Sequence, residues 1–137
     1  MSRKTARVAA VQMVFEALFG GDGGNETLID LIGLEPIEED LAFARQLSGG
    51  VREHAQEIDG LISDHLKGWT LDRISRVSHA VMRVAVYELL YEKDVPAGAV
   101  IKEAVSIAQR FDEEGEGRFV NGVLSGILKD TKPEAAE

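Results

Sequence analysis

Apolar residues recur along this 137-residue chain at the three- and four-residue spacing that places side chains on one face of an α-helix. Val8, Val11 and Phe15, for example, share one face, and the glycine-rich segment 20–25 ends that pattern. The spacings predict helices over residues 4–19, 28–32, 39–66, 77–90, 96–111 and 119–128, with a brief element at 69–74. No stretch keeps the two-residue alternation of a β-strand, so the pattern predicts an all-α bundle of about seven helices.

The predicted last helix contains Asn121-Gly122, a dipeptide that usually marks a turn. On a helical wheel these two residues lie with Ser125 and Gly126, opposite the apolar face. We therefore interpret the dipeptide as the interior of a helix whose small residues form a flat strip. The sequence leaves open whether this strip meets the protein's own core or something outside it.

Length and composition indicate one globular domain. The chain is 45% apolar and 28% charged, and no apolar stretch reaches the roughly 18 residues that a membrane span needs. The N-terminus has no signal-type apolar block, so a cytoplasmic protein without a membrane partner is expected. Residues 1–130 are expected to form the single domain, and residues 131–137, which have nothing to bury, a flexible tail.

A search for catalytic and metal-binding motifs gives little. The chain has no cysteine, its three histidines are isolated, and neither a phosphate-binding glycine loop nor a nucleophile elbow is present. The acidic clusters stand at predicted helix starts, where carboxylates stabilise the helix dipole. We therefore expect a protein without enzymatic activity, cofactor or metal site.

Charge is distributed unevenly along the chain. The net charge of −9 argues against a protein that coats nucleic acid by bulk electrostatics. Residues 1–15, however, contain Arg3, Lys4 and Arg7 and no acid, whereas residues 16–44 contain eight acids and no Lys or Arg. A basic segment beside an acidic body is compatible with nucleic-acid binding, and equally with a solvated helix start.

The central helix provides a second candidate basic surface. Arg73, Arg76, Arg83 and Tyr87 fall within a sector of roughly 80°, provided that the helix already includes Arg73. Guanidinium groups bind phosphate and stack on bases, and a tyrosine can stack an unpaired base. The alternative is that these arginines pair with acidic side chains of the long helix.

Four segments together resemble the NusB family of transcription antitermination factors: "ARVAAVQMVFE", "RISRVSHAVMRVAVYELLY", "DVPAGAVIKEAVSIAQRF" and "RFVNGVL". The resemblance covers the chain from Arg3 to about Leu128. It implies two packed helical subbundles and no catalytic activity. It also implies binding of boxA RNA in ribosomal RNA leader transcripts, jointly with the small-subunit ribosomal protein NusE, and entry into an antitermination complex on RNA polymerase.

The resemblance also implies functional residues. The candidates for RNA binding are Arg3, Lys4, Arg7, Gln12, Arg76, Arg83, Arg118 and Phe119. The candidates for contact with NusE are Phe15, Phe111 and Glu113. Family members occur as monomers and as homodimers, and the sequence does not choose between them.

Three positions depart from the family pattern. Lys102 stands where the family has Asn, and Gly115 and Gly117 replace polar residues of the loop before the last helix. The basic N-terminal segment is also thinner than in some relatives. These differences leave an alternative function open, namely an acidic protein-interaction adaptor of the same fold with weak or lost RNA binding.

Overall fold

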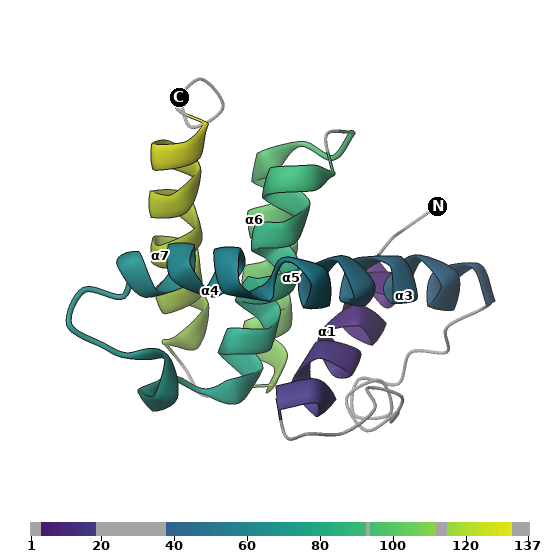
Figure 1. The fold of residues 1–137 in the computed structure, drawn as a ribbon, viewed down its shortest axis with the longest axis horizontal. Helices are drawn as coiled ribbons and strands as arrows, with labels where there is room; N and C mark the ends of the chain where they lie inside the picture. The colour runs from purple at the N-terminus through teal and green to yellow at the C-terminus, as the bar shows by residue number, and fades with distance from the viewer. Residues whose placement is uncertain (1–3, 19–37, 93, 112–114, 133–137) are drawn as a thin grey trace.

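A computed structural model of the chain describes residues 4–18, 38–92, 94–111 and 115–132 (Figure 1). This part contains helices and no strand, which confirms the all-α prediction. The elements are α1 (Lys4–Leu18), α3 (Glu38–Glu53), α4 (Ala55–Asp64), the 3₁₀ helix η1 (Leu71–Arg73), α5 (Arg76–Tyr91), α6 (Ala97–Phe111) and α7 (Glu116–Thr131). The helix expected at 28–32 lies outside the described residues.

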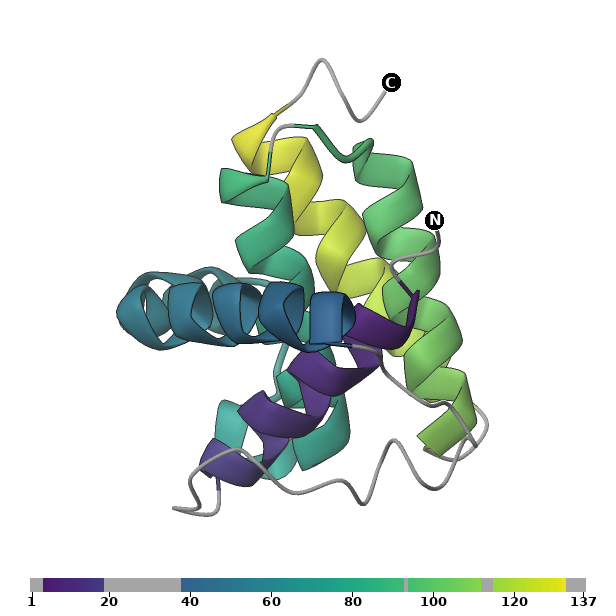
Figure 2. The same ribbon diagram turned by 90° about the vertical axis from the view of Figure 1, so that its right-hand side faces the viewer.

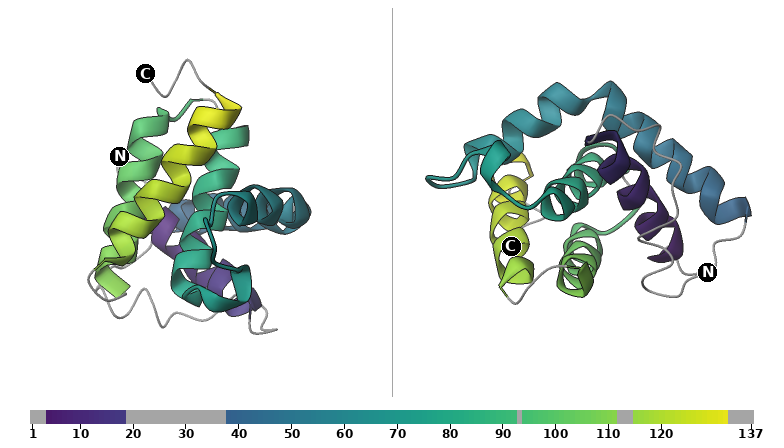
Figure 3. Two further views of the ribbon diagram at one scale, coloured as in Figure 1. Left: turned by 90° about the vertical axis from the view of Figure 1, so that its left-hand side faces the viewer. Right: turned by 90° about the horizontal axis from the view of Figure 1, so that it is seen from below.

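Helix α5 occupies the centre of the fold, as its nearly uniform apolar character predicts. On one side of it α1 and α3 pack together, and on the other α6 and α7 form a second pair (Figures 1 and 3). These are the two expected subbundles, and both are built on α5. Helices α3 and α4 follow one another across the outside of α5 and α7 (Figures 1 and 2). Helices α1 and α7 therefore lie on opposite sides of the molecule.

The single long helix expected over 39–66 is wrong, because the chain bends at His54 between α3 and α4. The bend lets both helices follow the surface of α5 (Figure 3). Gly49 and Gly50 weaken the last turns of α3, and a Cβ at Gly50 would overlap the ring of Tyr87 on α5. The His54 ring stacks on Tyr91, with centroids 4.3 Å apart. The apolar stripe continues through the bend, which explains why the sequence pattern does not reveal it.

The described part of α7 confirms a helix through Asn121-Gly122. The two glycines of its flat strip, Gly122 and Gly126, have different surroundings. A Cβ at Gly126 would lie 3.0 Å from the His65 ring, at the end of α4, whereas Gly122 has no described atom within 4 Å of that position. Gly126 thus serves internal packing, and Gly122 faces outward.

The C-terminal helix extends further than expected. It reaches Thr131, whose hydroxyl donates to the Ile127 carbonyl at 2.8 Å, and the Lys132 ammonium donates to the Leu89 carbonyl of α5. The first of these bonds lies within α7, and the second ties Lys132, in the expected tail 131–137, to α5. The remainder of that tail lies outside the described residues.

No helix in the described ranges is long and apolar enough to cross a membrane.

Candidate nucleic-acid interface

A hollow of about 260 Å³ lies where the segment after α4 meets the start of α7. Its lining residues are Trp69, Arg73, Ile74, Ser75, Glu116 and Phe119. The chain reaches it through Lys67 and Gly68, which both have positive φ, 50° and 95°, and so reverse the direction of the backbone. This turn leaves Trp69 with 57% of its surface exposed.

Helix ends fix the other walls of the hollow. The Ser75 hydroxyl caps α5 by accepting from the Ser78 amide at 3.2 Å. On the opposite side, Gly115 caps α7 with a φ of 105°, a conformation that favours glycine. Phe119 therefore projects from the first turn of a helix whose start is fixed. The hollow is framed by regular structure rather than by a free loop.

The chemistry of the hollow fits an unpaired nucleobase and its phosphate. Trp69 and Phe119 provide aromatic faces on which a base can stack, and Arg73 provides a guanidinium for phosphate or for a base plane. Glu116 is the one acidic side chain among the described lining residues, and it suits a base amino group or a cationic partner side chain better than a phosphate. Arg118, also predicted to bind RNA, is exposed on the same turn of α7.

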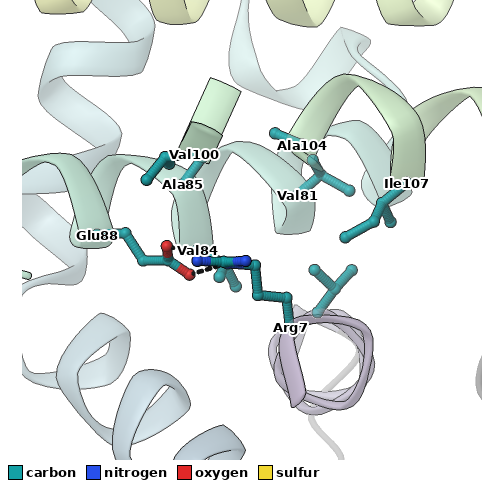
Figure 4. Close-up of a pocket in the computed structure, with 9 residues that line it drawn as sticks. Arg7, Val81, Val84, Ala85, Glu88, Val100, Ala104 and Ile107 are labelled. Atoms are coloured by element: carbon teal, nitrogen blue, oxygen red, sulfur yellow. Dashed lines mark hydrogen bonds and ion pairs between the residues drawn. The ribbon is translucent and has the colours of Figure 1, made fainter. Parts of the chain in front are cut away.

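Arg7, a candidate on the first helix, lies inside the bundle. Its guanidinium Nε donates to both carboxylate oxygens of Glu88 on α5, at 2.9 and 3.1 Å (Figure 4). Arg7 is 9% exposed and Glu88 1%. The cavity beside the pair holds about 10 Å³, room for no more than one water molecule. This arginine is engaged in joining α1 to α5.

Gln12 is likewise buried, with 1% of its surface exposed, and its amide donates to Glu16 at 3.1 Å. Lys4 is half-buried at the start of α1, and Arg3 lies outside the described residues. Helix α1, which carries the described first-helix candidates, and α7, which carries Arg118 and Phe119, stand on opposite sides of α5 (Figures 1 and 3). Their contact with RNA stays a prediction.

The predicted stripe of arginines on the central helix is wrong in one respect, because Arg73 belongs to η1 and not to α5. Arg83 shows the pairing that the sequence left as an alternative. Its Nε and Nη2 donate to the two oxygens of Asp59 on α4, at 2.9 and 2.5 Å, and His79 Nε2 lies 2.9 Å from Asp59 Oδ1. Arg76 is exposed at the first turn of α5.

This cluster sets the charge state of Asp59. Burial by itself would raise the pKa of the carboxyl group, but the hydrogen bonds from His79 and Arg83 and their positive charge lower it from 3.8 to about 2. Asp59 therefore stays ionised and ties α4 to the central helix.

The predicted partner residues are only partly described. Phe15 is half-buried on α1 and packs against the core. Phe111 is the last residue of α6, and its side chain, like all of Glu113, lies outside the described part of the chain.

Sequence reasoning missed Trp69 as a site residue. Its signal was a tryptophan directly after a glycine and four residues before an arginine, but only the fold brings it beside Phe119. In the described residues, no three His, Cys, Asp or Glu side chains are placed to hold a metal ion.

Comparisons with known proteins agree on one family. A family model described as "NusB family" matches residues 4–129. The transcription antitermination protein NusB of Bacillus velezensis is 41% identical over 130 residues, which is 95% of this chain and 98% of that protein. A structure of T. maritima NusB is 37% identical, with a TM-score of 0.82, and the alignment covers 99% of this chain and 96% of that one. A structure of antitermination factors NusB and NusE in complex with double-stranded RNA is 29% identical, with a TM-score of 0.77, covering 93% and 96%.

Proposed function

This chain belongs to the NusB family of transcription antitermination proteins, and we propose that it binds boxA-containing RNA of ribosomal RNA leader transcripts together with NusE. Family membership confirms the prediction of a non-enzymatic protein. We further propose that the complex joins the antitermination machinery on RNA polymerase in the cytoplasm.

The hollow beside α7 is the observation that carries this proposal. It combines two exposed or half-exposed aromatic rings, Trp69 and Phe119, with the guanidinium of Arg73. Each ring can stack one base without a sequence requirement, and such stacking contributes about 1–3 kcal/mol per base. Support for the two partners comes from the related structure in which NusB is bound to NusE and RNA.

A specific observation also supports the second candidate function, an adaptor that has lost RNA binding. Arg7 and Arg83, two of the basic residues predicted to bind RNA, are already held by Glu88 and Asp59. With a net charge of −9, the protein has little sequence-independent attraction for RNA. We therefore expect RNA affinity to depend on NusE. A homodimer stays a prediction of the family resemblance.

The two functions are separated by fluorescence anisotropy of a labelled boxA RNA, titrated with the protein in the presence and absence of NusE. The proposed function predicts a complex with NusE, and Phe119→Ala is expected to weaken it by about five- to a hundredfold, the loss of one base stack. Tyr91→Ala is the control for loss of an aromatic ring outside the hollow, since Tyr91 is 39% accessible at the far end of α5, where it stacks on His54.

Far-UV circular dichroism on both variants establishes that each remains folded. An RNA complex that Phe119→Ala weakens no more than Tyr91→Ala would contradict the assignment of the hollow. A wild-type protein that binds NusE but leaves the RNA anisotropy unchanged would favour the adaptor.

A further inference from the structure

Three aromatic rings gather where α3 and α4 meet and cross the C-terminal half of α5 (Figure 1). His54 stacks on Tyr91 with ring centroids 4.3 Å apart, and the Tyr91 centroid lies 5.3 Å from that of Tyr87. The Tyr87 ring fits because Gly50 has no side chain, since a Cβ there would lie 2.2 Å from the ring Cζ. We call the rings of His54, Tyr87 and Tyr91 the aromatic patch.

The aromatic patch is open to solvent at Tyr91, which is 39% exposed. In the described ranges, Tyr91 and Trp69 are the two large apolar side chains left exposed, and Trp69 already belongs to the hollow. Tyrosine is enriched in the contact surfaces of proteins because its ring is apolar and rigid while its hydroxyl stays hydrogen-bonded. No role has been given to this surface so far.

Glutamates surround the rings and act on both tyrosine hydroxyls. The Tyr91 hydroxyl donates to Glu57 Oε1 at 2.5 Å, and this bond raises the pKa of Tyr91. Burial and the charges of Glu92 and Glu53 raise the pKa of Tyr87. The electrostatic potential over the rings is therefore negative.

Little positive charge from the protein offsets these glutamates. Among the described residues, no lysine or arginine forms an ion pair with Glu53, Glu57 or Glu92. His54 Nδ1, in the patch itself, lies 3.6 Å from Glu57. Helices α3 and α5 both end here, at Glu53 and Tyr91, so the negative ends of two helix dipoles add to the field.

Aromatic faces beside unpaired carboxylates suit an arginine side chain. The guanidinium plane can stack on a tyrosine ring while its N–H groups donate to the Glu57 carboxylate. A lysine ammonium is more strongly hydrated and has no plane with which to stack. The glutamates would repel the phosphates of RNA. The chemistry of the patch therefore fits a basic segment of a protein.

The patch is separate from the hollow in which RNA is proposed to bind. Ser75, which lines the hollow, caps the start of α5, whereas Tyr87 and Tyr91 lie in its last turns. At 1.5 Å per residue these points are roughly 20 Å apart along the helix axis. The two surfaces can therefore be occupied at the same time.

We propose that the aromatic patch docks an arginine-containing basic segment of a protein other than NusE, with one guanidinium stacked on Tyr91 and donating to Glu57. The occupant is identified by charge complementarity and by the exposed ring. The proposal uses no residue of the hollow, so it goes beyond the proposed function and does not depend on it.

The tyrosine rings report binding directly, because Tyr87 and Tyr91 are the only tyrosines of the chain. Protein with ¹³C-labelled tyrosine rings is titrated, while NMR spectra are recorded, with a short peptide of alternating arginine and glycine. Matched lysine–glycine and glutamate–glycine peptides are the controls. We expect the arginine peptide to shift the ring signals of both tyrosines and to bind at least about twofold more tightly than the lysine peptide. The glutamate peptide should leave these signals unchanged.

Two charge variants separate the patch from the general acidity of the protein. Glu57→Gln and Glu39→Gln each remove one exposed negative charge, and Glu39 lies in the first turn of α3, at the opposite end of that helix from the patch. Glu57→Gln should weaken the arginine peptide by about two- to fivefold and Glu39→Gln by less than about twofold. Tyr91→Leu keeps an apolar side chain without an aromatic face and should weaken it by about two- to fivefold. Far-UV circular dichroism establishes that each variant is folded.

Equal affinities of Glu57→Gln and Glu39→Gln, or of the arginine and lysine peptides for the wild-type protein, would reduce the binding to net charge and overturn the proposal. A shift of both tyrosine signals on adding NusE alone, or boxA RNA alone, would assign the patch to that partner and also overturn it. Signals that move with protein concentration in the absence of peptide would identify a second copy of the chain as the occupant, with the same consequence. Selective binding of the arginine peptide by a protein that fails to bind RNA with NusE would support the patch and contradict only the proposed function.

Discussion

Replacing Arg7 by methionine removes the cationic half of a buried ion pair and is expected to destabilise the protein strongly. The guanidinium Nε lies 2.9 and 3.1 Å from the oxygens of Glu88, and the two side chains are only 11% and 1% exposed. Methionine keeps most of the hydrocarbon packing. The substitution leaves the buried Glu88 carboxylate without the opposite charge of Arg7, and this lowers the free energy of unfolding by about 3–5 kcal/mol.

Urea unfolding followed by far-UV circular dichroism measures this loss. The control is the double variant Arg7→Met/Glu88→Leu, which replaces the pair by apolar side chains and should recover most of the lost stability, because such replacements are often neutral. Anisotropy at saturating NusE then gives the RNA affinity of the folded double variant, which we expect within about twofold of wild type. A stable Arg7→Met protein with RNA affinity reduced tenfold or more would refute the reasoning and return Arg7 to the RNA surface.

Two further predictions concern the junction of α3, α4 and α5. Because the pKa of Asp59 is lowered from 3.8 to about 2, the stability from its ionised form is complete above about pH 4 and is lost as the pH falls through about 2. That loss amounts to about 2 kcal/mol in chemical denaturation, and Asp59→Asn should abolish it; an unchanged pH dependence would contradict the ion pair. Gly50→Ala should lower Tm because its Cβ would overlap Tyr87, whereas Gly49→Ala, with no described atom within 4 Å, should raise stability by about 0.5–1 kcal/mol; equal shifts would refute the close approach.

The helices were predictable because their signal is local. Each apolar face repeats within a few turns, so positions such as Val8 and Val11 predict α1 without knowledge of the rest of the chain. The bend at His54 was not predictable in this way. It depends on Tyr87 and Tyr91, which lie more than 30 residues further along and meet α3 and α4 only in the fold.

In the candidate site, too, residues with a local signal were predictable, and contacts between distant parts of the chain were not. Phe119 and Arg118 were found from the family pattern of "RFVNGVL", and both line surface depressions. The sequence places Arg7 in a basic segment. Its partner Glu88 is 81 residues away, so no local pattern indicates the ion pair. Trp69 stayed unassigned because its role depends on a neighbour 50 positions later in the chain.

Trp69 gives the most direct test of the central claim, that RNA occupies the hollow beside α7. It is the single tryptophan of the chain, so 5-fluorotryptophan labelling gives one ¹⁹F resonance from this protein even when unlabelled NusE is present. Adding boxA RNA to the labelled protein–NusE complex should shift or broaden that resonance, at the RNA concentration at which anisotropy reports binding. Saturated RNA binding with an unchanged Trp69 resonance would contradict the account.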